Sequence, residues 1–575
     1  TELEGVYEEK NMSLTRDNSK VQEAIFSSLF PKHPYGTQTV LGTQENLKNP
    51  SITNIKNYYK QWYVPNNMAI CMSGDLDPDA TIALIDKYFG GLKPNPELPK
   101  LDLPKEAPIT QPVVKEVLGP DAESVALAWR FPGVSDKDFE ILQVVSQVLY
   151  NGKAGLIDLD LNQQQKVLNS YGYPMGLADY SAFILGGLPK QGQMLEEVKD
   201  LLLNEIKKLR AGEFDEKMLQ ANINNFKLYE LQSMESNEGR ADIFVNSFIN
   251  GTNWEDEVTA IDRMAKLTKE DIVAFADKYL KEDNYAVVYK KQGKDPNEKK
   301  MTKPEITPIV SNRDVASPFL TSIQENAVKP IEPVFLDFKK DMSQLTAKSD
   351  IPVLYKQNTT NDLFQLIYVF DMGNNNDKAL GTAFDYLEYL GTSDMTPEEL
   401  KSEFYRLACT FYVSPGNERT YVVLSGLNEN MPAAMQLFEK LLADAQVNKE
   451  AYDNLVGDIL KARADAKLNQ GQNFSRLMNY AMYGQKSPAT NLLTEAELAS
   501  MNPQELVDRI HNQTNYKHRI LYYGPSSSKD LLATIDQYHQ VPATLKDIPA
   551  GNEFSYLETP ATKVLVAPYE AKQIY

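Results

Sequence analysis

Apolar residues at intervals of three and four positions predict helices along much of the chain. In VQEAIFSSLF, Val21, Ile25 and Leu29 recur every four residues, which is the spacing of one face of a helix. Similar patterns predict helices at ITNIKNYYKQWY, DATIALIDKYFGGL, DKDFEILQVVSQVLYNG and residues 193–210 and 215–248. Runs of alternating or continuous apolar residues predict strands at NMAICMSG, SVALAWRFPG, NYAVVYKK and LFQLIYVFDMG. This order of helices and strands favours an α+β fold.

Stretches without periodicity divide the chain. KPNPELPKLDLPKEAP, around residues 93–108, is rich in Pro and Lys and predicts a linker. Residues 292–350 contain only short extended pieces such as ITPIV and IEPVFLDF, and we expect an ordered strap along the outside, because IEPVFLDF is apolar. The expected organisation is the C-terminal part of a first domain, a second domain, a linker between two halves, a third domain and the start of a fourth: residues 1–92, 105–291, 292–350, 351–548 and 549–575.

Landmarks in the first half of the chain recur in the second. HPYG at 33–36 matches AMYG at 481–484, Gly74 matches Gly524, and IDKYF from Ile85 matches IDQYH from Ile535, at offsets of 448, 450 and 450 residues. In addition, SVALAWRFPG followed by a helix is similar to LFQLIYVFDMG followed by NDKALGTAFDYLEYL. These matches predict that one α+β unit is duplicated, with Gly74 superposing on Gly524 and Tyr35 on Tyr483.

Composition narrows the function classes. The 575 residues carry a formal net charge of −20, which disfavours nucleic acid as a partner. Cys71 and Cys409 are the only cysteines, so neither a disulfide framework nor a cysteine metal site is expected. No apolar stretch approaches the roughly 18 residues of a membrane span. The first residues contain no initiator Met and no signal-peptide pattern, and VLVAPYEAKQIY ends within a strand-like pattern. We therefore expect the sequence to be an internal fragment of a longer protein.

The opening TELEGVYEEKN places two carboxylates on one face of a helix. Glu2 and Glu9 are seven residues apart, nearly two full turns, whereas Glu8 points about a quarter turn away. On its own, such a pair is typical of a solvated helix face.

The succession of HPYG, VLGTQENL, YVPNNMAICMSGD and the helix ending in DKYFGGL resembles the insulinase/pitrilysin family of zinc metallopeptidases. The resemblance implies duplicated two-layer α/β domains in two halves joined by a long linker. It implies that Glu9 is a zinc ligand and that Glu2 is a neighbouring carboxylate that orients a ligating histidine. The family's His-x-x-Glu-His motif is absent, because His33, His511, His518 and His539 cannot form it. We therefore expect zinc in the complete protein, and neither bound zinc nor activity in this chain alone.

The second half of the chain lacks the ligands of a metal site at the position where the repeat would carry them. At the repeat position FDYLEYLGT, Asp385 and Tyr389 stand where the two histidines would be, Glu388 is retained, and positions 457–459 read Gly, Asp, Ile. This half is therefore expected to be degenerate. We do not expect metal ligation by the following histidines. His33 is expected to have a surface or packing role in a turn, and His511 and His518 are expected to be solvated.

The resemblance implies a zinc-dependent endopeptidase that degrades or processes peptides or unfolded polypeptides inside a closed chamber. The alternative is a non-catalytic peptide-binding or scaffold member of the same fold. The bacterial periplasm or cell envelope is the expected compartment, with the cytoplasm as the alternative.

Overall fold

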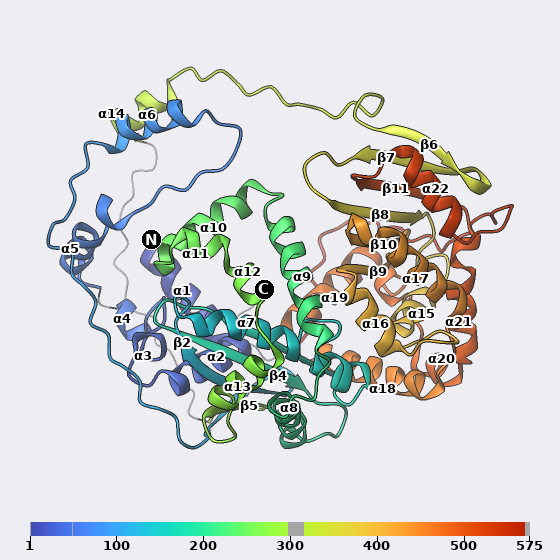
Figure 1. Ribbon diagram of the computed structural model, residues 1–575, viewed down its shortest axis with the longest axis horizontal. Helices are drawn as coiled ribbons and strands as arrows, with labels where there is room; N and C mark the ends of the chain where they lie inside the picture. The colour runs from blue at the N-terminus through green and yellow to red at the C-terminus, as the bar shows by residue number, and fades with distance from the viewer. Residues whose placement is uncertain (1, 49, 297–314, 570–575) are drawn as a thin grey trace.

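Two β-sheets organise the chain in the computed structural model, which describes residues 2–48, 50–296 and 315–569 (Figure 1). The first sheet has the order β1-β5-β2-β4-β3 and contains β1 (Val113–Gly119), β2 (Ser124–Pro132), β3 (Asn169–Met175), β4 (Tyr180–Leu188) and β5 (Tyr285–Gln292). The second has the order β6-β7-β11-β8-β10-β9 and contains β6 (Ser343–Ala347), β7 (Ile351–Gln357), β8 (Leu363–Phe370), β9 (Cys409–Pro415), β10 (Thr420–Leu427) and β11 (Arg519–Gly524). We refer to residues 113–292 as the first-sheet unit and to residues 343–548 as the second-sheet unit.

The two sheets share one topology. In the first, β1 runs parallel to β5, β2 is antiparallel to β5, and β4 and then β3 continue the antiparallel order. In the second, β7, β11, β8, β10 and β9 repeat this arrangement, with β6 added at the edge. The matched segments SVALAWRFPG and LFQLIYVFDMG contain the equivalent strands β2 and β8. The predicted α+β fold with a duplicated unit is therefore confirmed.

Helices cover both faces of the first sheet because its strands are apolar on both sides. Leu127 and Trp129 of β2 are buried in the same cluster as residues of α7 (Lys137–Leu149), α8 (Leu195–Arg210) and α13 (Lys269–Tyr279). Ala126 and Ala128, which alternate with them, pack with α2 (Asp17–Leu29), whose Ile25 and Leu29 are buried as the sequence pattern predicts. Further helices are α1 (Glu2–Thr15), α3 (Pro34–Thr37), α4 (Gln44–Lys48), α5 (Ile52–Trp62), α6 (Pro78–Phe89), α9 (Lys217–Ser233), α10 (Asn237–Asn250), α11 (Trp254–Val258) and α12 (Ala260–Met264).

The second-sheet unit has one large core. Phe364, Leu366, Tyr368 and Phe370 of β8 are buried in it together with residues of the surrounding helices. These helices are α15 (Leu380–Leu387), α16 (Pro397–Arg406), α17 (Met431–Asp444), α18 (Lys449–Ala466), α20 (Glu495–Ser500), α21 (Pro503–Asn512) and α22 (Ser528–Tyr538). The helix α19 (Gln470–Tyr483) follows α18 but contains no residue of the core.

The predicted strand NMAICMSG is wrong. Residues 68–73 have no regular secondary structure, Ile70 and Met72 are exposed, and Gly74 lies in a bend, whereas Gly524 ends β11. The predicted superposition of these two glycines therefore fails, although Tyr35 and Tyr483 both lie in helices. Within the described chain these residues pair with no strand, and an unpaired strand is not stable in water.

Two further apolar segments do not pack as expected. IEPVFLDF, residues 331–338, follows α14 (Pro318–Gln324) and has no helix or strand, and its apolar side chains are exposed, including Val334 at 98%. Figure 1 shows this part of the chain running singly from α14 to β6. ITPIV lies outside the described residues. The strand pattern of VLVAPYEAKQIY is also wrong over residues 564–569, which form no strand, while residues 570–575 are not described.

Candidate functional site

The helix α1 buries Tyr7 and Lys10 and exposes two of its carboxylates, Glu8 and Glu9. Tyr7 and Lys10 are buried, and Lys10 Nζ lies 3.0 Å from Glu23 Oε1 on α2. Glu8 and Glu9 are exposed, while the side chain of Glu2 is outside the described part. The Glu9 carboxylate is therefore presented to solvent on an anchored helix.

Glu9 and the other described residues do not by themselves form a zinc site. Among residues 2–48, 50–296 and 315–569, no three His, Cys, Asp or Glu side chains are grouped so that they could hold a metal. His33 is the only histidine in the first five hundred residues, and its Nδ1 accepts the Tyr35 N–H at 3.2 Å as the cap of α3. Because one ring nitrogen is engaged in this cap and the side chain is 1% exposed, His33 has a structural role.

His518 and His539 of the second-sheet unit form a buried network, so the expectation that His518 is solvated is wrong, while His511 is half-buried with its Nε2 3.0 Å from Ala445 O. His518 Nε2 lies 2.9 Å from His539 Nε2, and His539 Nδ1 lies 2.7 Å from Glu439 Oε1, which also accepts the Tyr368 hydroxyl at 2.7 Å. Burial, followed by the neighbouring His539, lowers the pKa of His518 to about 4. The segment NYKHRILYY gives a partial signal, because His518 directly precedes the buried strand β11.

The degenerate position on α15 faces the first-sheet unit rather than a metal. Asp385 and Glu388 lie on the exposed side of the helix, and Tyr389 is half-buried. Burial and the nearby Asp458 raise the pKa of Tyr389 to about 12. Asp458 in turn lies 3.0 Å from Lys190 Nζ, which follows β4. In the sequence, Asp458 stands out only because it lies near the repeat position of Glu9. Nothing in the sequence marks Lys190 as its partner.

Buried polar side chains join the two units near this position. The Tyr405 hydroxyl of α16 donates to Asn222 Oδ1 of α9 at 2.9 Å, and Asn225 Nδ2 donates to Tyr405 O at 2.8 Å. All three residues are buried. The two units are therefore held against each other by specific hydrogen bonds.

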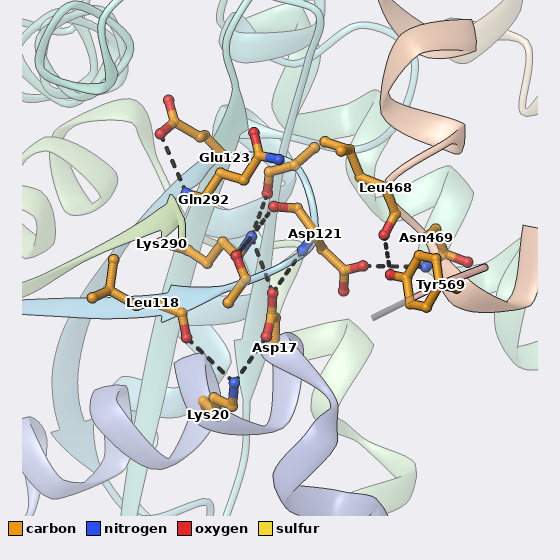
Figure 2. A network of polar contacts seen from close by, with 12 residues as sticks. Asp17, Lys20, Leu118, Asp121, Glu123, Lys290, Gln292, Leu468, Asn469 and Tyr569 are labelled. Carbon is orange, nitrogen blue, oxygen red and sulfur yellow. Dashed lines mark hydrogen bonds and ion pairs between the residues drawn. The ribbon is translucent and has the colours of Figure 1, made fainter. Parts of the chain in front are cut away.

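A second link lies around Asp121, in the connection between β1 and β2 (Figure 2). Lys290 Nζ of β5 lies 3.0 Å from Asp17 Oδ2, which also accepts the Asp121 N–H at 3.0 Å. Asp121 Oδ1 accepts Asn469 Nδ2 at 3.5 Å, and the Tyr569 hydroxyl donates to Leu468 O. This network connects α2 and the first sheet with the α18–α19 connection and a residue close to the C-terminus.

No helix of the described residues is both long and apolar enough to cross a bilayer.

Comparisons with known proteins agree with the fold. Residues 51–226 match the family described as Peptidase M16 inactive domain. The chain is 27% identical over 277 residues to the zinc protease PqqE of Helicobacter pylori, which covers 46% of this chain and 61% of that protein. It is 29% identical over 85 residues to the probable mitochondrial-processing peptidase subunit beta of Schizosaccharomyces pombe, covering 15% and 18%. The chain thus spans less than two thirds of the length of these relatives.

Solved structures that match this chain include two proteases, both at low TM-scores. The periplasmic protease PqqL from Escherichia coli has a TM-score of 0.42 and 15% identity, covering 96% of this chain and 64% of that one. The ferredoxin protease FusC, solved in complex with Arabidopsis ferredoxin, has a TM-score of 0.49 and 13% identity, covering 97% and 65%. The family match over residues 51–226 and the sequence relatives show that this chain is similar to zinc proteases and processing peptidases of the M16 family.

Proposed function

We propose that the complete protein is a zinc-dependent endopeptidase that degrades or processes peptides in a closed chamber between two halves. In this proposal Glu9 is the third zinc ligand, and Glu2 is the carboxylate that orients a ligating histidine. The observation that carries the assignment is the exposed Glu9 carboxylate on α1, a helix fixed to α2 through Lys10. The two histidine ligands and the general base are not in this sequence.

In this proposal the two halves have different roles, and the second-sheet unit belongs to the non-catalytic half. Its repeat of the metal position contributes contacts between units, such as the ion pair of Asp458 with Lys190, rather than a ligand set. We propose that this half closes the chamber and holds the substrate, which is a peptide or an unfolded polypeptide. The net charge of −20 disfavours nucleic acid, and the cell envelope is the compartment that we propose.

The test compares Glu9→Gln, Glu2→Gln and Glu8→Gln in the complete protein, by zinc content and by cleavage of an unstructured quenched peptide. Glu9→Gln should sharply weaken zinc binding, because an amide oxygen is a much poorer ligand than a carboxylate. Glu2→Gln should lower metal affinity or activity by about 10- to 100-fold. Glu8→Gln should be nearly silent and is the matched control.

The chain of residues 1–575 alone is the second control and should be metal-free and inactive with Glu9 intact. Equal, small effects of the three substitutions would end the ligand assignment. A coding sequence upstream of Thr1 without His-x-x-Glu-His would favour the non-catalytic, peptide-binding alternative.

A further inference from the structure

A cavity at the contact between the two sheet units is lined by residues of both. Its volume is about 170 Å³, and its walls include Lys153 from the loop after α7, Leu387 and Glu388 at the end of α15, Lys401 and Phe404 of α16, and Phe411 of β9. An engineered protein cavity of about 150 Å³ with apolar walls binds benzene. This cavity is therefore large enough for one aromatic ring or a short branched chain.

Lys153 lines this cavity, whose other wall residues are mostly apolar, and its amine has no ion-pair partner among the described residues. Within the described residues, Lys153 Nζ has no hydrogen bond and no carboxylate within 4.0 Å. Glu388, the carboxylate of α15 that lines the cavity, is paired with Lys401 Nζ at 3.6 Å. Burial lowers the pKa of Lys153 to about 8, although Cys409 and Glu388 act in the opposite direction. Burial also raises the pKa of the Cys409 thiol to about 12, so the thiol is neutral at pH 7.

The loop that carries Lys153 is rigidly built. Asp158 Oδ2 accepts the backbone N–H groups of Asn151, Gly152 and Gly155 at 2.8, 3.1 and 3.0 Å. Gly152 has a φ of +80°, which favours glycine, and a Cβ at Gly155 would lie 2.7 Å from Leu149 O. Since Asp158 is committed to these backbone groups, it is not available to pair with the amine. The loop holds Lys153 in place before any ligand arrives, which lowers the entropic cost of binding.

We propose that this cavity binds a carboxylate carried on a benzene-sized apolar group, with Lys153 Nζ as its counterion. The ligand carboxylate pairs with Lys153, since the Glu388 carboxylate in the wall is already paired with Lys401, and the side chains of Leu387, Phe404 and Phe411 contact the apolar group. The C-terminal residue of a peptide and a free organic acid share this chemistry. Because both units line the cavity, the ligand also strengthens their contact. The proposal is independent of the peptidase activity, since it uses no residue of the α1 face.

The test is titration calorimetry of the chain with 3-phenylpropionate, with the tripeptide Ala-Ala-Phe and with the C-terminal amide of that tripeptide. At pH 7, 3-phenylpropionate, the tripeptide acid or both should bind, and which of them binds identifies the source of the carboxylate. The amide should bind at least about 10-fold more weakly than the tripeptide acid, because it offers no charge to the amine. Affinity for the acids should fall as the pH rises through about 8, where Lys153 loses its proton.

Lys153→Met should weaken binding of the acids by about 10- to 100-fold, the range expected for a lost charge-assisted hydrogen bond. The same variant should raise the thermal midpoint, because it removes a half-buried charge without a partner, so weaker binding will not reflect unfolding. Lys137→Met makes the same chemical change at an exposed site outside the cavity and should leave binding unchanged. Equal affinity of Lys153→Met and the parent, equal loss in Lys137→Met, or no binding of either acid by the parent would overturn the proposal.

Discussion

The Tyr405 hydroxyl lies 2.9 Å from Asn222 Oδ1, and this hydrogen bond joins the second-sheet unit to the first through side chains that are at most 1% exposed. Burial raises the pKa of Tyr405 well above its ordinary value, so the hydroxyl remains a donor. The Asn222 oxygen is removed from water at the same contact and depends on this donor.

Tyr405→Phe should lower the free energy of unfolding by about 1 to 3 kcal/mol, because it leaves the buried Asn222 oxygen without its donor. The urea midpoint of the variant measures the effect. Tyr412→Phe removes a hydroxyl from an exposed tyrosine on β9 and should leave the midpoint unchanged. Identical midpoints for all three proteins would show that the hydrogen bond contributes nothing to the contact.

Lys290→Met should destabilise the protein by up to about 3 to 5 kcal/mol, since it removes the buried ion-pair partner of Asp17 and leaves only the partly exposed Lys20, at 3.1 Å. The double variant Asp17→Asn with Lys290→Met should recover most of this loss, because no buried charge is then unpaired and Lys20, which loses Asp17, is partly exposed. Thermal and urea unfolding of the two variants and the parent provide the comparison. A double variant less stable than Lys290→Met would contradict this account.

The ion pair of Asp17 with Lys290 also makes the stability of the fold depend on pH in acid. Burial acts to raise the pKa of Asp17, but hydrogen bonds from the Asp121 N–H, Lys290 and Lys20 outweigh it, so the pKa lies below the ordinary 3.8. The folded-state pKa is depressed, so the stabilisation is fully present above about pH 4 and is lost as the pH falls through the lower folded value. Stability measured from pH 5 to pH 2 should fall less steeply in Asp17→Asn than in the parent.

His518 should make the second-sheet unit acid-sensitive at a higher pH. Its pKa is lowered from 6.5 to about 4, so the neutral form stabilises the fold above pH 6.5, and this contribution is lost as the pH falls toward 4. The slope from this group is at most about 1.4 kcal/mol per pH unit. His518→Gln, which cannot take up the proton, should flatten the urea midpoint between pH 6.5 and 4.5, whereas His511→Gln, at a half-buried position outside the pair, should not. A parent with no slope in this range would rule out a titrating His518.

Limited proteolysis should cut the chain between its two sheet units. Phe335, Leu336 and Phe338 are 65 to 83% exposed in a segment without helix or strand, so chymotrypsin should cleave there before it cleaves either sheet. The two fragments should co-elute in gel filtration because Tyr405, Asn222 and Asn225 still join them. Mass spectrometry of the first fragments identifies the site, and earlier cuts within residues 124–132 or 363–370 would contradict the structure.

Much of the local structure was already predictable from the amino-acid order. The four-residue spacing of Val21, Ile25 and Leu29 predicts α2, and the similarity of SVALAWRFPG to LFQLIYVFDMG identifies β2 and β8 as equivalent strands. These patterns are sufficient because the helical repeat and the alternation of a strand act over a few neighbouring residues. The family motifs and the missing His-x-x-Glu-His can likewise be read directly from the chain.

The tertiary structure decided which residues far apart in the chain meet. NMAICMSG has the composition of a strand, yet it forms none because no described strand lies beside it, and strand pairing is a long-range interaction. The pairing of Asp17 with Lys290, the burial of His518 against His539 and the position of Lys153 in a cavity beside Phe404 likewise depend on how sheets and helices pack. The charge and burial of each of these groups depend on its partners, and local spacing contains no information about a partner that lies 21 residues away, as for His518 and His539, or hundreds of residues away.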